Sequence, residues 1–230
     1  MKIKLAYLLV ITLLLLPSNI VFGEELEVVR EYWKKYILWG KGNLKKEIHY
    51  KNGKKEGLTR YWYRSGKKKG EKSFKNGKID GPLIWWHESG KKMGEVHYKD
   101  GKKNGPGGWW YDNGTKRFEE HYSEGKKVGL WINWRKSGQK MSERHYKDGK
   151  PHGRWGRWYD NGTKRLEEHY SEGKRVGLWI NWHKSSQKMS ERHYKDGKPH
   201  GRWTNWSEDG KITGQENKGN QGSFTEEKPQ

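Results

Sequence analysis

The sequence predicts an all-β protein: an elongated antiparallel meander of about seven 24-residue β-hairpin repeats in a single open sheet. Three observations predict this fold class. They are a strict 24-residue period, Asn-Gly and Asp-Gly pairs at fixed places, and the absence of any segment with the 3.6-residue apolar spacing of a helix. Two turns and two short strands in each period make one hairpin per repeat. A closed barrel is the structural alternative, but the strict period and the atypical ends favour an open sheet.

The chain begins with the pattern of a secretory signal peptide, residues 1–23. Lys2 and Lys4 precede an apolar run of 12 residues, and a cut is expected after Gly23. A run of 12 is short for a membrane span, which needs about 20 residues. We therefore expect a secreted or periplasmic protein.

Three further segments follow the signal peptide. Residues 24–49 read as a degenerate leading half-repeat that caps the array, and residues 50–213 form the repeat array itself. Residues 214–230 are polar and rich in glycine, so we expect a flexible tail.

Five positions of the repeat hold without exception over seven units: an aromatic residue, Gly, Lys, Gly and Trp. The aromatic positions are Tyr50, Phe74, Tyr98, Tyr122, Tyr146, Tyr170 and Tyr194. The lysines are Lys54, Lys78, Lys102, Lys126, Lys150, Lys174 and Lys198. The tryptophans are Trp62, Trp86, Trp110, Trp134, Trp158, Trp182 and Trp206. A longer period of 48 residues is present as well, because residues 112–155 and 160–203 differ at four positions only.

The composition of the 230 residues is contradictory until the repeat is seen. A formal net charge of +21 and a hydrophobic share of 30% are typical of disorder, but 15 Trp and 13 Tyr are not. We therefore expect a core built from the invariant Trp residues together with Tyr122, Tyr146 and Tyr170. The absence of Cys excludes disulfides, thiolate zinc sites and a Cys nucleophile.

The pattern G-K-x-x-G-x-x-x-x-W-x-x-x-G, as in Gly125, Lys126, Gly129, Trp134 and Gly138, resembles the MORN-repeat variant of bacterial exported and toxin–antitoxin-associated proteins. The resemblance covers about residues 40–213. It implies an elongated array of β-hairpins and implies little about chemistry. Many bacterial relatives carry an antitoxin-type label, but a secretory signal argues against neutralising a cytoplasmic toxin.

No catalytic or phosphate-loop motif is present, and a Glu in every repeat favours a structural role over an acid–base pair, so we expect no enzyme activity and no cofactor. Six histidines share one repeat position, each two residues after a Glu: His49, His97, His121, His145, His169 and His193. A metal site or a pH sensor is one interpretation of this Glu–His series. A polar outer face with cross-strand pairs is favoured, because a metal site is normally unique, and we expect no metal.

A second Trp row precedes the invariant Trp by three residues, which places it on the opposite sheet face. Its members are Trp131, Trp155, Trp179 and Trp203. The row is either extra packing over a thin sheet or a series of aromatic platforms for sugar rings, peptide side chains or a membrane interface. We take it as the candidate binding surface.

The basic residues favour either solubility and edge protection or attraction to an anionic surface, such as lipid head groups or polysaccharide of an envelope or host cell. Export makes nucleic acid a less suitable partner. The expected function is an exported, non-enzymatic β-repeat scaffold for protein or cell-surface interaction. Alternatives are a glycan- or anionic-lipid-binding module that uses Trp and Lys, and an antitoxin or immunity-type inhibitor of a toxin.

Overall fold

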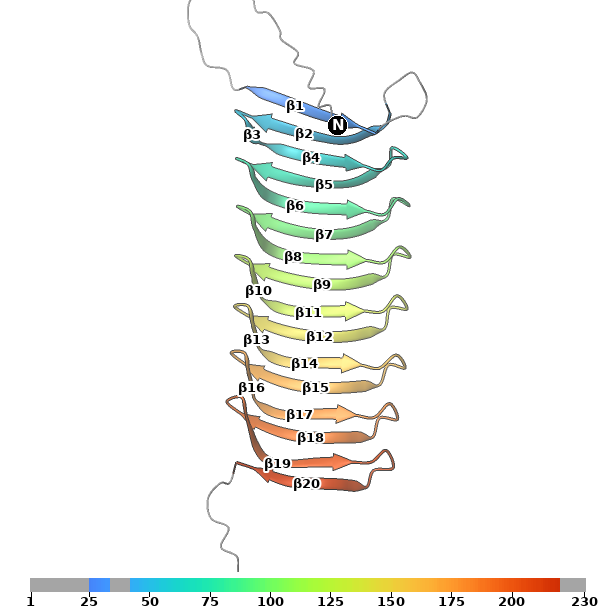
Figure 1. Cartoon of the computed structure of the whole chain (residues 1–230), viewed down its shortest axis with the longest axis vertical. Coiled ribbons are helices and arrows are strands. Elements are labelled where there is room, and N and C mark those ends of the chain that lie inside the picture. Colours follow the sequence, from blue (N-terminus) through green and yellow to red (C-terminus); the bar gives the residue numbers. More distant parts are fainter. Residues whose placement is uncertain (1–24, 34–41, 220–230) are drawn as a thin grey trace, which may run out of the picture.

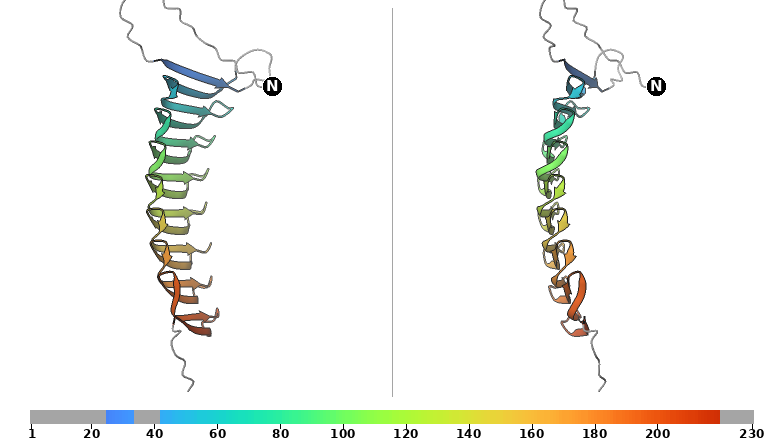
Figure 2. Two further views of the ribbon diagram at one scale, coloured as in Figure 1. Left: turned by 60° about the vertical axis from the view of Figure 1, so that its left-hand side comes forward. Right: turned by 90° about the vertical axis from the view of Figure 1, so that its left-hand side faces the viewer.

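The computed structural model describes residues 25–33 and 42–219. These residues form 20 strands and no helix, and every strand pairing is antiparallel. Figure 1 shows the strands stacked in chain order as one open sheet, and the turned views of Figure 2 show a narrow, gently curved ribbon. The predicted fold class is therefore confirmed. The signal peptide and its cleavage site lie outside the described residues.

Each repeat contributes one hairpin whose strands pair with their neighbours in sequence, and in four repeats the first strand is divided into two short strands. The strands are β1 Leu26–Tyr32, β2 Leu44–Lys51, β3 Lys54–Lys55, β4 Gly57–Trp62, β5 Lys68–Lys75, β6 Lys78–Trp86, β7 Lys92–Lys99, β8 Lys102–Trp110, β9 Lys116–Ser123, β10 Lys126–Lys127, β11 Gly129–Trp134, β12 Lys140–Lys147, β13 Lys150–Pro151, β14 Gly153–Trp158, β15 Lys164–Ser171, β16 Lys174–Arg175, β17 Gly177–Trp182, β18 Lys188–Lys195, β19 Lys198–Trp206 and β20 Ile212–Lys218. Since β20 reaches Lys218, residues 214–218 continue the sheet, whereas the sequence assigns them to the tail.

The first turn of each repeat is the two-residue hairpin turn that the sequence predicts. Both central residues have positive φ, for example 49° at Asn52 and 72° at Gly53, as a type I′ turn requires. Glu124 and Glu172 occupy the first central position in two units and adopt the same φ of 48°. The turn is thus imposed by the array even where the residue does not favour it.

The second turn differs from the expectation of a tight Asn-Gly hairpin. Gly114 has a φ of 91°, but Asn113 is not in the left-handed region. Its hydrogen bonds close a longer loop: the Gly114 N–H donates to the Tyr111 carbonyl at 2.9 Å, and the Tyr111 N–H donates to the Thr115 carbonyl at 2.9 Å. This loop is a type I turn followed by a left-handed glycine.

The sheet has two faces with different chemistry. The cross-strand pairs Trp131–Arg144 and Gly129–Tyr146 lie on one face, which we call the ladder face. The pair Ile132–Glu143 lies on the other, which we call the Glu–His face. The invariant Trp residues belong to the Glu–His face, as shown by the Trp110 ring, which lies over Gly108. The two Trp rows are therefore on opposite faces, as the sequence predicts.

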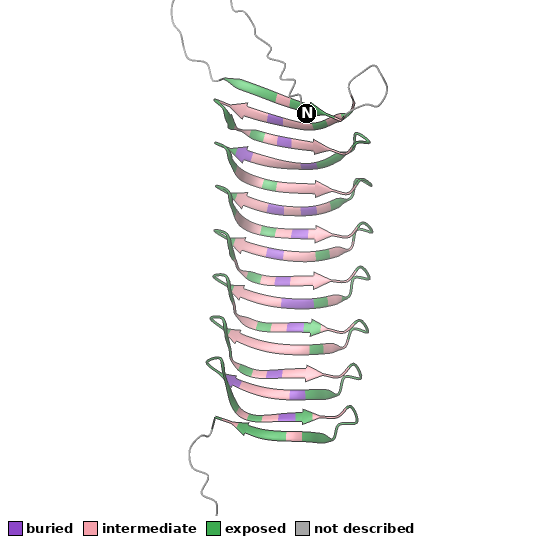
Figure 3. Ribbon diagram, in the orientation of Figure 1, coloured by how far each residue is buried: buried purple, intermediate pink, exposed green. Residues whose placement is uncertain are grey.

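Buried residues run along the middle of the strands, and the turns are exposed (Figure 3). The buried hydrophobic side chains are Ile48, Phe74, Val96, Trp131, Trp179 and Tyr194. By strand alternation all of them belong to the ladder face. The core is consequently a single layer of side chains on one side of the sheet.

Candidate functional site

The second Trp row forms a continuous aromatic ladder with the tyrosines of neighbouring strands. Ring centroids are 5.1 Å apart for Tyr122–Trp131 and 5.3 Å for Trp131–Tyr146. The same alternation continues from Tyr146 through Trp155, Tyr170, Trp179 and Tyr194 to Trp203, with spacings of 4.6 to 5.5 Å. Tilted and edge-on ring pairs at this separation are mutually stabilising.

Burial limits what this ladder can bind. Trp131 and Trp179 are each 7% exposed, while Trp155 and Trp203 are half-buried. Each indole N–H is also taken, since the Trp155 Nε1–H donates to the His145 carbonyl at 2.9 Å and its counterparts do the same. The structure thus favours packing for the row that the sequence offers as a binding surface.

The invariant Trp residues are all half-buried rather than fully enclosed. Each ring from Trp86 onward lies under a lysine ammonium group of the preceding repeat, at 4.6 Å for Lys68 over Trp86 and 5.0 Å for Lys140 over Trp158. The same lysine binds a Glu three residues on, as in Lys140–Glu143 at 2.8 Å. Trp, Lys and Glu therefore form one repeating set of contacts across the Glu–His face.

The histidines of the Glu–His face are held on both sides of the ring. The Nδ1 of His121 lies 2.9 Å from the Leu130 carbonyl, and its Nε2 lies 3.9 Å from the Glu119 carboxylate. Burial would raise the pKa of Glu143 on this face, but Lys140, Arg154 and His145 together lower it below its ordinary value. Among residues 25–33 and 42–219, no three His, Cys, Asp or Glu side chains are grouped to hold a metal ion.

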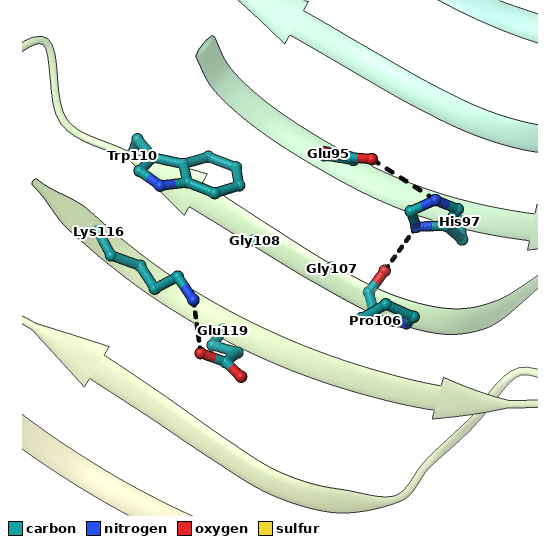
Figure 4. A pocket seen from close by; sticks show the side chains of 8 residues that line it. All are labelled: Glu95, His97, Pro106, Gly107, Gly108, Trp110, Lys116 and Glu119. Carbon is teal, nitrogen blue, oxygen red and sulfur yellow. Dashed lines mark hydrogen bonds and ion pairs between the residues drawn. The ribbon is translucent and has the colours of Figure 1, made fainter. Parts of the chain in front are cut away.

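A small hollow of about 190 Å³ interrupts the Glu–His face at Gly108, whose position holds Ile in three other repeats, at Ile84, Ile132 and Ile180 (Figure 4). Glu95 and Glu119 lie on either side of Gly108, because both pair with it across the sheet. The Glu119 carboxylate binds Lys116 at 2.7 Å, and the Glu95 carboxylate lies 3.5 Å from His97. Both acids therefore already have charged or polar neighbours.

A row of exposed lysines runs along one long side of the ribbon. These seven invariant residues, the lysine row, each follow a type I′ turn: Lys54, Lys78, Lys102, Lys126, Lys150, Lys174 and Lys198. A Cβ built on Gly77 would lie 3.9 Å from the Lys54 Cβ, and the next five pairs in the row repeat this contact at 3.8–3.9 Å. Two strand spacings separate successive lysines, so their ammonium groups recur at roughly 10 Å.

The lysine row is an invariant position at which all seven side chains are exposed. The invariant Gly residues have positive φ, and the aromatic and Trp residues pack on the two faces. Protection of a sheet edge does not explain the lysines, because the edges of this sheet are β1 and β20, whereas the row lies at the turns. The sequence shows that these lysines are invariant, but it does not show that all seven are exposed in register on one side of the ribbon, and the combination of invariance and exposure is the signal that finds the row.

Comparison with known proteins supports the repeat assignment over part of the chain. Residues 55–76 and 79–100 match the MORN repeat variant, and no curated protein matches the chain. Each matched segment spans one hairpin unit, from the strand after a type I′ turn to the next such turn. The chain therefore contains repeats of the MORN variant within residues 55–100, in a repeat scaffold that continues with the same period on both sides.

Proposed function

We propose that this protein is an exported, non-enzymatic scaffold that binds an anionic polymer or surface along its lysine row. The observation that carries the proposal is the row itself: seven identical, exposed side chains in register along one side of the ribbon. The residues that flank and form the seven type I′ turns include twelve lysines against five carboxylates. This side of the molecule therefore has a strongly positive potential.

The other long side carries lysines that are less available. Lys136 lies 2.8 Å from Asp112, and Lys184 lies 3.0 Å from Asp160. In the lysine row, by contrast, the one ion pair within 4 Å among the described residues is Lys102–Glu124, at 3.9 Å. A ligand with regularly spaced phosphate or carboxylate groups would therefore meet unpaired ammonium groups on the lysine row.

Binding by such a row depends on repetition rather than on a pocket. A lysine near an anionic membrane contributes about 1 kcal/mol. Contacts that are individually weak become strong when one rigid molecule presents several of them to the same ligand. Sequence features at residues 1–23 support export, which places envelope or host-surface polyanions within reach. Binding to a partner protein and inhibition of a toxin stay predictions from the sequence.

The test compares two variants with equal loss of charge. In the first, Lys78, Lys102, Lys126, Lys150 and Lys174 become Gln. In the matched control, five lysines of the opposite side become Gln: Lys67, Lys91, Lys136, Lys184 and Lys211. Binding is measured by co-sedimentation with vesicles that contain anionic phospholipid, and by fluorescence polarisation with labelled linear polyphosphate and polygalacturonate, each over a range of salt.

The lysine-row variant should lose at least a hundredfold in affinity and show a weaker salt dependence, while the control loses little. Preference for vesicles over the soluble polymers would identify a lipid surface as the source of the anions. Preference for the soluble polymers would identify a polymer. Equal losses in both variants would overturn the proposal, because net charge alone would then explain binding. The absence of binding to all three probes would overturn it too.

A further inference from the structure

A second hollow, of about 340 Å³, lies on the ladder face between β14 and β18 and is surrounded by positive charge. Four arginines line it: Arg157, Arg165, Arg175 and Arg192. One carboxylate, Glu168, is present among the lining residues. The arginines come from four different strands, so the cluster exists only in the folded array.

Three of the arginines are held in place by aromatic rings. The Arg175 guanidinium carbon lies 4.5 Å from the Trp179 ring and 5.3 Å from the Tyr194 ring. The Arg192 guanidinium lies 5.2 Å from the Trp203 ring and donates to the Ser190 hydroxyl at 3.0 Å. Arg165 lies over Tyr159 at 5.7 Å. Stacking fixes the plane of a guanidinium while leaving N–H groups at its edge free to bind an anion.

Arg157 is the member that the repeat does not require. Its position holds Asn in three other units, at Asn133, Asn181 and Asn205. Asn133 and Asn181 donate to the hydroxyls of Ser142 and Ser190 at 3.0 and 2.9 Å. Within the described part of the chain, the Arg157 guanidinium has no hydrogen bond and no ion pair within 4 Å. It therefore contributes an unpaired positive charge to the hollow.

Glu168 does not neutralise this charge by a close ion pair. Its carboxylate accepts a hydrogen bond from the Tyr170 hydroxyl at 3.3 Å, and burial raises its pKa although Arg157 and Arg175 oppose the rise. The equivalent acid 48 residues earlier, Glu120, binds Lys103 at 3.3 Å. The residue that corresponds to Lys103 is Pro151, so the second unit has lost that lysine.

We infer that this arginine hollow binds a single oxyanion, a phosphate or carboxylate group on a small molecule or at the end or side of a polymer. Four guanidinium groups around one concavity provide bidentate donors for such a group, and Arg suits planar or tetrahedral oxyanions better than Lys does. The site is separate from the lysine row, because it lies on a face of the sheet and not at the turns.

The chain contains its own control for this site. The hollow 48 residues earlier is lined by Trp109, Arg117, Phe118 and Asn133, and has the same volume of about 340 Å³. Trp109 stands where the second unit has Arg157, Phe118 where it has Leu166, and Lys127 where it has Arg175. The two hollows thus have the same volume and share one arginine position, Arg117 and Arg165, but the earlier hollow lacks the counterparts of Arg157 and Arg175.

The experiment titrates the protein with inorganic pyrophosphate and, separately, with glucuronate by isothermal calorimetry. The loss variant is Arg157→Asn, which installs the residue that three other repeats have at this position and so keeps the fold. The gain variant is Trp109→Arg with Phe118→Leu and Lys127→Arg. It gives the earlier hollow the counterparts of Arg157, Leu166 and Arg175. The lysine-row variant serves to separate this site from the proposed function.

We expect one equivalent of one probe to bind the wild type, a loss of at least tenfold in affinity for Arg157→Asn, and a second equivalent for the gain variant. The lysine-row variant should retain the single site. Unchanged binding in Arg157→Asn, or binding that disappears only in the lysine-row variant, would overturn the inference. So would the absence of binding to both probes, and an unchanged stoichiometry in the gain variant would overturn the assignment to these arginines.

Discussion

The two halves of the array fill the ladder face with different residues at different positions. In the first half, Trp85 and Trp109 supply the rings, and Leu83 occupies the position two residues before Trp85. In the second half the ring has moved to this earlier position, as in Trp155 and Trp179. In these repeats the two positions together supply one Trp, in addition to the Tyr or Phe of the aromatic position on the same face.

The cross-strand neighbours explain why the exchange involves two positions at once. Trp85 and Trp109 lie over Gly70 and Gly94, where a Cβ would come within 2.1 and 2.4 Å of the indole rings. In the second half the corresponding pairs are Ser142–Arg157, Leu166–Asn181 and Ser190–Asn205, so a larger residue stands in place of the Gly and a polar one in place of the Trp. The Trp ring and the Gly beneath it are therefore expected to be substituted together.

The largest effect should come from removing a ring of the aromatic ladder. Trp179→Ala deletes contacts with Tyr170 and Tyr194, the stacking partner of Arg175, and the hydrogen bond to the His169 carbonyl. We expect a loss of about 3–5 kcal/mol in the free energy of unfolding. Leu83→Ala, at the equivalent position of the first half, should cost about 2 kcal/mol, because Trp85 still covers that part of the face. Urea unfolding followed by circular dichroism measures both, and equal losses would show that the two halves are packed alike.

The exchange between the halves can be tested directly at Gly94. Gly94→Ser places a side chain where the Trp109 ring lies, and we expect a loss of about 2–3 kcal/mol from overpacking. The double variant Gly94→Ser with Trp109→Asn reproduces the pair Ser190–Asn205 of the second half. If the two positions form a unit, the second substitution should recover part of the loss caused by the first. Additive losses in the double-mutant cycle would contradict this coupling.

The sequence predicts the repeat, the hairpins and the separation of the two Trp rows, because these follow from a period of 24 and from strand alternation. It does not predict which row is more buried. That ranking depends on the register that brings Tyr146 and Tyr170 against Trp155, and a period alone does not fix register. The arginine hollow is missed for the same reason, since Arg157 and Arg192 are 35 residues apart and meet through several strands.

Substitution of two equivalent acids on the ladder face should change the free energy of unfolding in opposite directions. Glu120→Gln removes the partner of the half-buried Lys103, whose pKa is raised by Glu120 and Tyr122 against the opposing effect of burial. We expect it to cost about 1–2 kcal/mol at pH 7. Glu168→Gln should instead stabilise the protein slightly at pH 7, because burial raises the pKa of Glu168.

The direction of the stability change expected for Glu168→Gln follows from proton linkage. A carboxyl group with a raised folded-state pKa binds protons more tightly in the folded protein, so its contribution to stability falls as pH rises from the ordinary Glu value through the raised one. The advantage of Glu168→Gln should therefore be absent in acid and appear as pH increases across that window. Unfolding experiments from pH 3 to pH 8 measure it, and a gain that is present at pH 3 and constant with pH would contradict this cause.

The smallest expected effect concerns the second turn, at a position where the two near-identical segments differ. Gly138 and Ser186 occupy the same left-handed position, with φ values of 88° and 76°. Because a Cβ disfavours this conformation, Ser186→Gly should stabilise the protein by about 1 kcal/mol, and Gly138→Ser should destabilise it by a similar amount. Thermal melts of both variants compare the same exchange in opposite directions. Each repeat of an array contacts only its neighbours, so the two changes in stability should be close to equal in size. A marked inequality would show that the surroundings of the turn differ between the two segments.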